Sequence, residues 1–531
     1  MASKSLFQSI VGKFLAAADV LNRAGGLAYS RTAEQALAQY VATGMLGSTC
    51  YANAETHLAT VLRLAQKVSP EFIARAAIYS RDRAYLKDVP ALLVALLTVK
   101  SPELVTSELF QRVIDSPKML RNFVQIIRSG VVGRKSLGSR PKRLVREWLD
   151  ARSDQALFVG SVGNDPSLGD IVKMVHPVPR TPSREALYAW LIGREYEEGA
   201  LPPIVQEYER IKRQVIRGKD ELPEVPFSML THLPLTPSDW KQIARNASWQ
   251  TTRMNLNTFE RHGVLQDQEL VRCIANRLRN PRAIQQARVF PYQLMAAYLN
   301  MNETLPSKIK AALGEAMELA ISNVPRIEGK VLVMVDVSGS MRSPATGNRG
   351  SATSKVRCVD VAALIAASIV RKNPEAEVIP FSDDVIPVKL DRQQPVMKQA
   401  QQLASLPSGG TNCSAALAHA NARQLTASMV IYVSDNESWI DSQSQWKGHR
   451  ATETMRQWQL FQKRNPQAKL VCLDLVPGET TQAIERSEIF HIGGFSDHVF
   501  TLLAEIAEGR TATDYFVKQI DAIELQSSEK A

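Results

Sequence analysis

An apolar run, KVLVMVDV, occupies residues 330–337 and stops at a tight polar segment, SGSM. A run of this length with almost no polar alternation is typical of a strand buried on both faces in a parallel sheet. Further strand-like runs lie at 376–381, 429–433, 470–476 and 490–493, and helical runs lie at 359–371, 396–406, 452–464 and 499–508. Because strands and helices alternate, residues 328–531 are predicted to form a doubly wound α/β domain, with the polar insert 342–355 as a loop.

The end of the first predicted strand offers oxygen ligands for a metal. Asp336, Ser338 and Ser340 form a D-x-S-x-S pattern, in which Gly339 permits the turn. Ligands of doubly wound sheets bind beyond the carboxyl ends of the strands. A hard cation such as Mg²⁺ prefers oxygen ligands and keeps several waters. The alternative is that these residues only cap helices and turns.

This pattern resembles the opening of the metal-ion-dependent adhesion site (MIDAS) of von Willebrand factor A domains, and the order of the later strands and helices agrees. The resemblance implies that Thr411 and Asp435, at later strand ends, complete the site. We expect Ser338, Ser340 and Thr411 to bind the cation directly, and Asp336 and Asp435 to bind it directly or through water. Mg²⁺ is the expected cofactor, with Mn²⁺ and Ca²⁺ as alternatives. An acidic side chain of a partner protein, or a phosphate, would fill an open position.

Residues 1–327 follow a different pattern, with helical spacing of apolar residues at 33–46, 54–67, 90–99, 104–114 and 119–129. Several helices are predicted to begin at a Ser or Thr followed by Pro, as at Ser69-Pro70 and Thr181-Pro182. The hydroxyl caps the helix and Pro presets its first turn. Strand-like alternation is nearly absent here. Such helices close as one bundle or stack as an irregular solenoid, and the pattern leaves both open.

Positive charge is concentrated in this helical part. The chain has 64 Lys and Arg residues against 53 Asp and Glu. Residues 1–327 carry a net charge of +13 and residues 328–531 a net charge of −2. The segment 116–146 holds nine basic residues and no acidic one. Clustered cations of this kind favour a polyanion such as RNA. The alternative is a solvated surface whose charges are balanced by acids from elsewhere in the fold.

Several other classes of protein are disfavoured. No apolar run approaches the roughly 18 residues of a membrane-spanning helix, and Lys13 and Asp19 interrupt any signal-peptide core. The five cysteines form no CxxC pair, so neither a zinc ribbon nor a disulfide framework is expected. No HExxH, P-loop or GxSxG motif is present. We therefore expect a cytoplasmic protein that is not an enzyme.

Five further segments together resemble one family. They are GGLAY at 25–29, GRK at 133–135 with KRLVREW at 142–148, DIVKMVHP at 170–177, RMNLN at 253–257 and ARVFPY at 287–292. With a helical basic region ahead of a von Willebrand factor A domain, the chain resembles the Ro ribonucleoprotein (TROVE-domain) family, as a bacterial orthologue. The resemblance implies an α-helical ring of HEAT-like repeats at 1–327, closed by the A domain at 328–531.

The resemblance also implies a function in RNA quality control. Small non-coding Y-type RNA would bind the outer basic face, and single-stranded 3′ ends of misfolded or precursor RNA would enter a central hole. The expected partners are these RNAs and a 3′ exoribonuclease, with no membrane, and the protein would be a monomeric ring. The predicted RNA-binding residues are Arg134, Lys135, Arg140, Lys142, Arg143, Arg146, Lys173, His176, Arg253 and Arg288, and the resemblance places His176 at the hole. Trp148 is expected to be a core residue and not a base-stacking platform.

Two other functions compete with this one. The chain could be a metal-dependent protein-interaction scaffold in which the basic region is only an interface. An RNA-processing enzyme is the third reading, and it is disfavoured because no acid–base pair or two-metal carboxylate cluster is visible.

Overall fold

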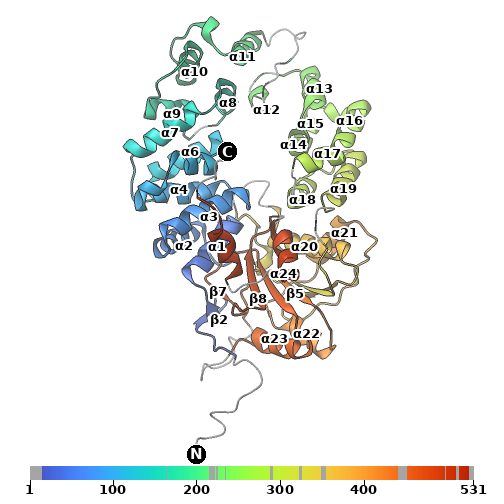
Figure 1. Cartoon of the computed structure of the whole chain (residues 1–531). Helices are drawn as coiled ribbons and strands as arrows, with labels where there is room; N and C mark the ends of the chain where they lie inside the picture. The colour runs from blue at the N-terminus through green and yellow to red at the C-terminus, as the bar shows by residue number, and fades with distance from the viewer. Residues whose placement is uncertain are drawn as a thin grey trace, which may run out of the picture.

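A computed structural model places a helical part above an α/β domain (Figure 1). The structure describes residues 15–163, 165–214, 222, 225, 227–231, 233, 235–287, 291–321, 324, 326–348, 355–439, 451–496, 498–509 and 514–525. The helices form two arms that rise from the α/β domain around a common centre. The first arm runs from α1 to α11 and the second from α12 to α19, and α11 and α13 lie at the ends of the arms farthest from the sheet.

Helices of the first arm begin where the capping residues predict. The Ser69, Ser116 and Thr181 hydroxyls each accept the backbone N–H three residues further on, with Pro in the first turn. The first-arm helices are α1 (Ala33–Thr43), α2 (Ala54–Lys67), α3 (Pro70–Asp82), α4 (Asp88–Lys100), η1 (Pro102–Leu104), α5 (Ser107–Val113), α6 (Pro117–Ser129), α7 (Ser139–Asp150), α8 (Asp154–Val159), α9 (Leu168–Val175), α10 (Pro182–Ile192), η2 (Glu198–Ala200) and α11 (Pro203–Gln214).

The second arm has shorter helices that return the chain to the α/β domain. They are α12 (Phe227–Leu230), α13 (Pro237–Asn246), α14 (Trp249–Met254), α15 (Leu256–Arg261), η3 (Val264–Gln266), α16 (Gln268–Leu278), α17 (Pro281–Gln286), α18 (Pro291–Leu299) and α19 (Ser307–Ile321). Neighbouring helices stack on one another in both arms, α3 on α4 and α16 on α19 among them. The predicted fold class, a stacked helical region followed by an α/β domain, is confirmed. No helix in the part of the chain that the structure describes is long and apolar enough to cross a membrane.

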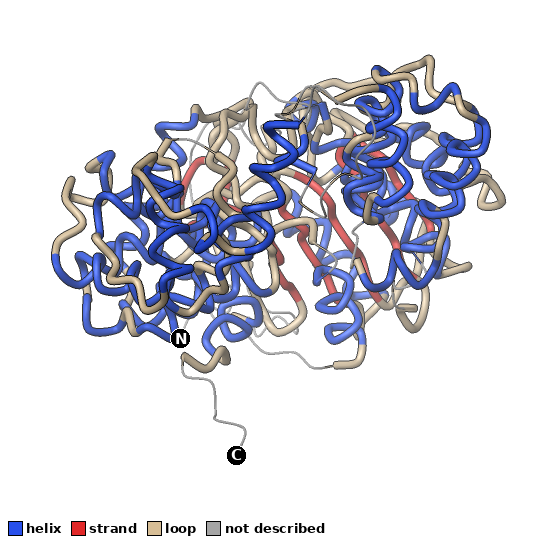
Figure 2. Tube along the Cα trace, turned by 90° about the horizontal axis from the view of Figure 1, so that it is seen from above, coloured by secondary structure: helices blue, strands red, loops and turns tan. Residues whose placement is uncertain are grey.

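A five-stranded parallel sheet forms the centre of the α/β domain, in the order β4-β3-β5-β6-β8. Its strands are β3 (Val331–Asp336), β4 (Glu377–Phe381), β5 (Met429–Ser434), β6 (Lys469–Asp474) and β8 (Ile489–Gly493). The surrounding helices are η4 (Ser340–Arg342), α20 (Cys358–Lys372), α21 (Val396–Ala404), α22 (Ala415–Ala422), α23 (Glu453–Arg464), α24 (His498–Ala507) and α25 (Tyr515–Asp521). Figure 2 shows the strands running through the molecule with helices on both sides.

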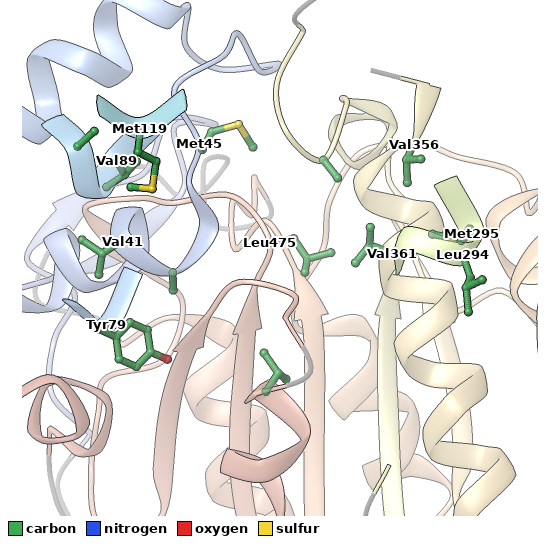
Figure 3. Packing of buried hydrophobic residues seen from close by; sticks show 14 of the residues in the cluster. Val41, Met45, Tyr79, Val89, Met119, Leu294, Met295, Val356, Val361 and Leu475 are labelled. Atoms are coloured by element: carbon green, nitrogen blue, oxygen red, sulfur yellow. The ribbon is translucent and has the colours of Figure 1, made fainter. Parts of the chain in front are cut away.

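The two faces of the sheet belong to different cores. Leu332 and Met334 point toward α22 and α23, where Trp458 is buried. Val333 and Val335 point toward α20, and this core continues without a break into both helical arms. Figure 3 shows this continuity, with Leu294 and Met295 of α18 beside Val361 of α20. The arms and the α/β domain are therefore packed together through one face of the sheet.

The two ends of the chain cross between the helical part and the α/β domain. Two short strands, β1 (Val20–Leu21) and β2 (Leu27–Ser30), pair antiparallel, and β2 also pairs with β7 (Thr480–Thr481). At the other end, α25 packs against α1 and α3. These strands depart from the expectation of almost no strand before residue 329, because they are stabilised by a partner more than 400 residues away. The predicted domain boundary before Glu328 lies between α19 and β3.

Candidate metal centre and basic helix face

The five predicted metal ligands meet at the carboxyl end of the sheet. Asp336 is the last residue of β3, Ser338 and Ser340 lie in the turn that leads into η4, and Asp435 directly follows β5. Thr411 approaches from the loop before α22. All five side chains are buried, none being more than 8% exposed. The parallel strands bring these residues together because their carboxyl ends share one edge of the sheet.

Short hydrogen bonds hold the centre in place. The Asp336 carboxylate accepts the Ser338 backbone N–H at 2.9 Å and the Ser434 hydroxyl at 2.6 Å. The Ser338 and Ser340 hydroxyl oxygens lie 3.2 Å apart. The Thr411 loop is joined to the serine turn by the Gly339 backbone N–H, which donates to the Gly409 carbonyl at 2.9 Å. Hydrogen bonds thus hold the Asp336 carboxylate in place and join the serine turn to the Thr411 loop.

The electrostatics of the centre favour a cation. Burial raises the pKa of Asp336. Burial also raises the pKa of Asp435, and the neighbouring Asp336 carboxylate raises it further. Two buried carboxyl groups beside three hydroxyl groups form a hard oxygen donor set that fits Mg²⁺ or Mn²⁺, and a divalent cation would compensate both charges. In the described part of the chain, no group of three or more His, Cys, Asp or Glu side chains could hold a metal, so this centre depends on its hydroxyl groups.

A cationic surface runs along α7 and the end of α9. One side of α7 packs into the core through Leu144, Val145, Trp148 and Leu149. Trp148 is fully buried, which confirms the expectation that it is a core residue. The opposite side of α7 presents predicted RNA-binding residues to solvent. On this surface Arg143, Arg146, Lys173 and His176 are exposed, and Lys142 is half-buried; Lys135, in the loop before α7, is also exposed. We call this surface the α7–α9 basic face.

Contacts between the two helices fix the geometry of the basic face. The Arg146 Nε donates to the Val175 carbonyl at 2.5 Å, which holds the end of α9 against α7. His176 is the C-cap residue of α9 and has the left-handed backbone conformation, with φ of 49°, so the helix ends there. Lys173 lies in the last turn of α9. The predicted residues of 142–146 and 173–176, separated in sequence, are thus brought together.

Other predicted RNA-binding arginines are engaged within the fold. Arg134 donates to the Ser136 and Leu137 carbonyls at 2.8 and 2.6 Å. Arg140 donates to the Glu103 carbonyl at 3.1 Å. In the second arm, Arg253 of α14 donates to the Gln293 carbonyl of α18 at 2.8 Å, and burial lowers the pKa of its guanidinium. Arg288 lies outside the described residues. Their roles in RNA binding stay predictions.

Sequence reasoning missed one exposed cation beside the basic face. Arg128, in the last turn of α6, is exposed; hydrogen bonds from Ser167 lower the pKa of Asp170 at the start of α9, and the charge of Arg128 adds a smaller contribution. The sequence signal for Arg128 was its position in the segment 116–146, which contains no acidic residue.

A pocket at the base of the two arms was also missed. It has a volume of about 270 Å³ and lies where the first arm, α18 and the α/β domain meet. Tyr85, Lys87, Lys118, Tyr292 and Phe495 are among its lining residues, and the Tyr292 and Phe495 rings lie 4.9 Å apart. Burial lowers the pKa of Lys87, and the nearby Lys118 lowers it further. No sequence signal could have found this pocket, since its residues come from six separate stretches of the chain.

Comparison with known proteins agrees with this architecture. The family model described as the Ro60 vWA domain matches residues 330–507. A Deinococcus radiodurans protein named RNA-binding protein RO60 is 23% identical over 525 residues, which cover 92% of this chain and 95% of that protein. The crystal structure of the Deinococcus radiodurans RO (RSR) protein superposes with a TM-score of 0.59 at 18% identity, covering 90% of this chain and 99% of that one. The resemblance inferred from sequence is confirmed: the chain is similar to Ro proteins over nearly its whole length, and residues 330–507 match the Ro60 von Willebrand factor A domain.

Proposed function

We propose that this chain is a non-catalytic RNA-binding protein that uses the α7–α9 basic face to hold structured RNA. The observation that carries the proposal is this face itself, where exposed cations from two helices are held in one geometry by the Arg146 contact with α9. The relationship to a protein named for RNA binding supports it. Cations arranged along a helix face contact phosphates and position an RNA helix without reading its sequence. A small Y-type RNA is the proposed ligand.

A second RNA-binding mode is proposed for the space between the arms. The pocket at their base combines aromatic side chains with Lys87 and Lys118. Aromatic rings stack on unpaired bases and cations hold the backbone, which suits a single-stranded 3′ end better than a duplex. Such an end would come from misfolded or precursor RNA, and a 3′ exoribonuclease is the proposed protein partner in the cytoplasm. The α7–α9 basic face would then bind structured RNA, while the pocket would bind a free single-stranded 3′ end.

Charge reversal on α7 tests the first mode. Lys142→Glu with Arg143→Glu should weaken binding of a structured RNA by at least about tenfold, because it removes two phosphate contacts and adds two repulsive charges. Lys463→Glu with Arg464→Glu is the matched control, since these neighbouring exposed residues end α23 of the α/β domain and change the net charge equally. Binding is measured by fluorescence anisotropy at fixed salt. Equal losses in both double variants would mean that general charge, and not this face, carries the affinity.

The metal centre supports an additional proposed role, as a docking point for an acidic side chain of a partner protein. The buried pair of Asp336 and Asp435 favours an occupied centre, because a bound cation relieves the repulsion between them. Titration calorimetry of Mn²⁺ or Mg²⁺ into the full chain tests occupancy, and Asp336→Ala should abolish binding while RNA affinity survives. The full chain is needed because β2, from the N-terminal end, pairs with the domain. If the wild type binds no cation at millimolar concentration, the proposed metal role is wrong.

A further inference from the structure

A tight turn near the N-terminus packs against the loop that follows the proposed ligand Asp435. This turn, residues 22–26, joins β1 to β2, and we call it the N-terminal turn. The Gly26 backbone N–H donates to Asn22 Oδ1 at 2.8 Å, and the Asn22 backbone N–H donates to the Gly26 carbonyl at 2.8 Å. The N-terminal turn is therefore held in shape by its own hydrogen bonds.

Hydrogen bonds join the N-terminal turn to the loop after β5. Asn22 Nδ2 donates to the Ser438 carbonyl at 2.7 Å, and the Arg23 backbone N–H donates to Glu437 Oε2 at 2.8 Å. Glu437 and Ser438 are buried, at 3% and 1% exposed. A Cβ on Gly26 would overlap the Ser438 carbonyl oxygen. The second glycine of the GGLAY segment is thus required for the turn to approach this loop.

The same loop residues also contact two of the proposed metal ligands. The Glu437 backbone N–H donates to Asp435 Oδ1 at 3.3 Å. The Ser438 hydroxyl donates to the Thr411 carbonyl at 3.2 Å and accepts the Cys413 backbone N–H at 3.2 Å. Glu437 and Ser438 therefore connect the N-terminal turn to Asp435 and to the segment that carries Thr411.

A second connection runs through Asn436 and β7. Asn436 directly follows Asp435 and has a left-handed backbone conformation, with φ of 64°. Its side-chain amide donates to the Thr481 hydroxyl at 2.9 Å and accepts the Gln482 backbone N–H at 3.1 Å. Thr481 belongs to β7, which pairs with β2 (Figure 1). The β1–β2 hairpin thus supports the loop after β5 both directly and through its neighbouring strand.

We propose that the N-terminal turn positions Asp435 and Thr411 for the cation, with Asn22 and Gly26 as the positioning residues. The inference rests on the proposed metal centre. Mg²⁺ demands near-ideal geometry from its oxygen ligands, so displacement of the loop between the turn and the ligands lowers metal affinity. Because coupling between two equilibria is reciprocal, a bound cation also stabilises the docked state of the N-terminal turn.

Metal affinity of glycine variants tests the positioning role. Mn²⁺ is titrated into the full chain, and free Mn²⁺ is measured by electron paramagnetic resonance. Gly26→Ala should weaken Mn²⁺ binding by about fivefold or more, because the added methyl group displaces the Ser438 carbonyl. Gly25→Ala is the matched control. Gly25 has a φ of 80°, so alanine is strained there, but its Cβ would meet no atom of the described chain within 4 Å. Gly25→Ala should lower thermal stability while its Mn²⁺ affinity stays within about twofold of wild type.

Hydrogen exchange tests the reciprocal effect. Saturating Mn²⁺ should slow exchange of the Arg23 and Gly26 amides in the wild-type chain, whereas exchange in α16 of the second arm should stay unchanged. Asn22→Ala removes the hydrogen bond to Ser438 and should weaken Mn²⁺ binding by about two- to tenfold, the equivalent of one net hydrogen bond. This variant keeps the inference testable if Gly26→Ala does not fold.

The outcomes separate this inference from the metal proposal. If the wild type binds no Mn²⁺, the metal centre and the positioning role both fail. If the wild type binds Mn²⁺ and the Gly26→Ala and Asn22→Ala variants bind it equally well, only the positioning role fails. Equal losses of affinity in Gly25→Ala and Gly26→Ala would also refute it, since general weakening of the hairpin would then explain both.

Discussion

Replacement of Arg31 by Met should strongly destabilise the junction between the N-terminal strands and the α/β domain. Arg31 Nη2 lies 2.5 Å from Asp474 Oδ2 at the end of β6, and the two side chains are only 3% and 2% exposed. Arg31 also donates to the Gly478 carbonyl at 3.0 Å. Removing one partner of a buried ion pair leaves an uncompensated charge and costs about 3–5 kcal/mol. The backbone amides of strand β2, which directly precedes Arg31, should be the first to lose protection against hydrogen exchange.

A nearby ion pair provides the control. Arg63 Nη2 lies 2.6 Å from Glu479 Oε2, almost the same separation, but these side chains are 44% and 40% exposed. Exposed pairs contribute about 0–1 kcal/mol because water already solvates both charges. Arg63→Met should therefore change the free energy of unfolding by a small fraction of the Arg31→Met effect. The comparison isolates burial, since pair geometry and local sequence region are matched.

Hydrogen exchange of the β2 amides and urea denaturation measure both variants at pH 8. A second change, Asp474→Asn on the Arg31→Met background, should recover part of the loss because it removes the buried charge. Equal destabilisation by Arg31→Met and Arg63→Met would refute the reasoning. So would a double variant that is no more stable than Arg31→Met alone, because the loss would then come from packing and not from the unpaired carboxylate.

Further predictions concern pH, packing and salt. Burial and the Asp514 carboxylate raise the pKa of Glu485 to about 7. The folded state therefore holds an extra proton between the ordinary Glu pKa and about 7, and it loses stability as the pH rises through that window. Glu485→Gln should flatten this decline in thermal melts between pH 5.5 and pH 8. Trp148→Ala removes a fully buried ring, should cost about 3–5 kcal/mol, and should lower RNA binding only together with loss of helical circular dichroism. The Lys142→Glu and Arg143→Glu double variant should reduce the slope of log affinity against log salt by about two, one for each phosphate contact, and an unchanged slope would remove these residues from the interface.

Local chemistry was sufficient for much of the fold and for the turn that carries three of the five proposed metal ligands. The apolar run that became β3 is buried at every position, and a strand of that kind has no stable place outside the centre of a parallel sheet. Ser69 and Thr181 cap helices through contacts that span three residues. Asp336, Ser338 and Ser340 are neighbours in sequence, so one turn was enough to group three of the five proposed ligands. The helix caps and this turn depend on interactions that short segments contain within themselves, whereas β3 needs β4 and β5 as partners.

Tertiary structure alone decided which side chains are available and what surrounds them. Arg140 looks like a free cation in sequence, yet the Glu103 carbonyl, 37 residues earlier in the chain, accepts its hydrogen bond. Strand β2 exists because β7 returns to pair with it, and four residues without a partner would not be stable as a strand. The Ser48 carbonyl accepts the Asn348 backbone N–H only because the α1–α2 loop packs against the segment after η4. The last two contacts join residues hundreds of positions apart, and no local pattern records them, because their free energy arises only when the whole chain has folded.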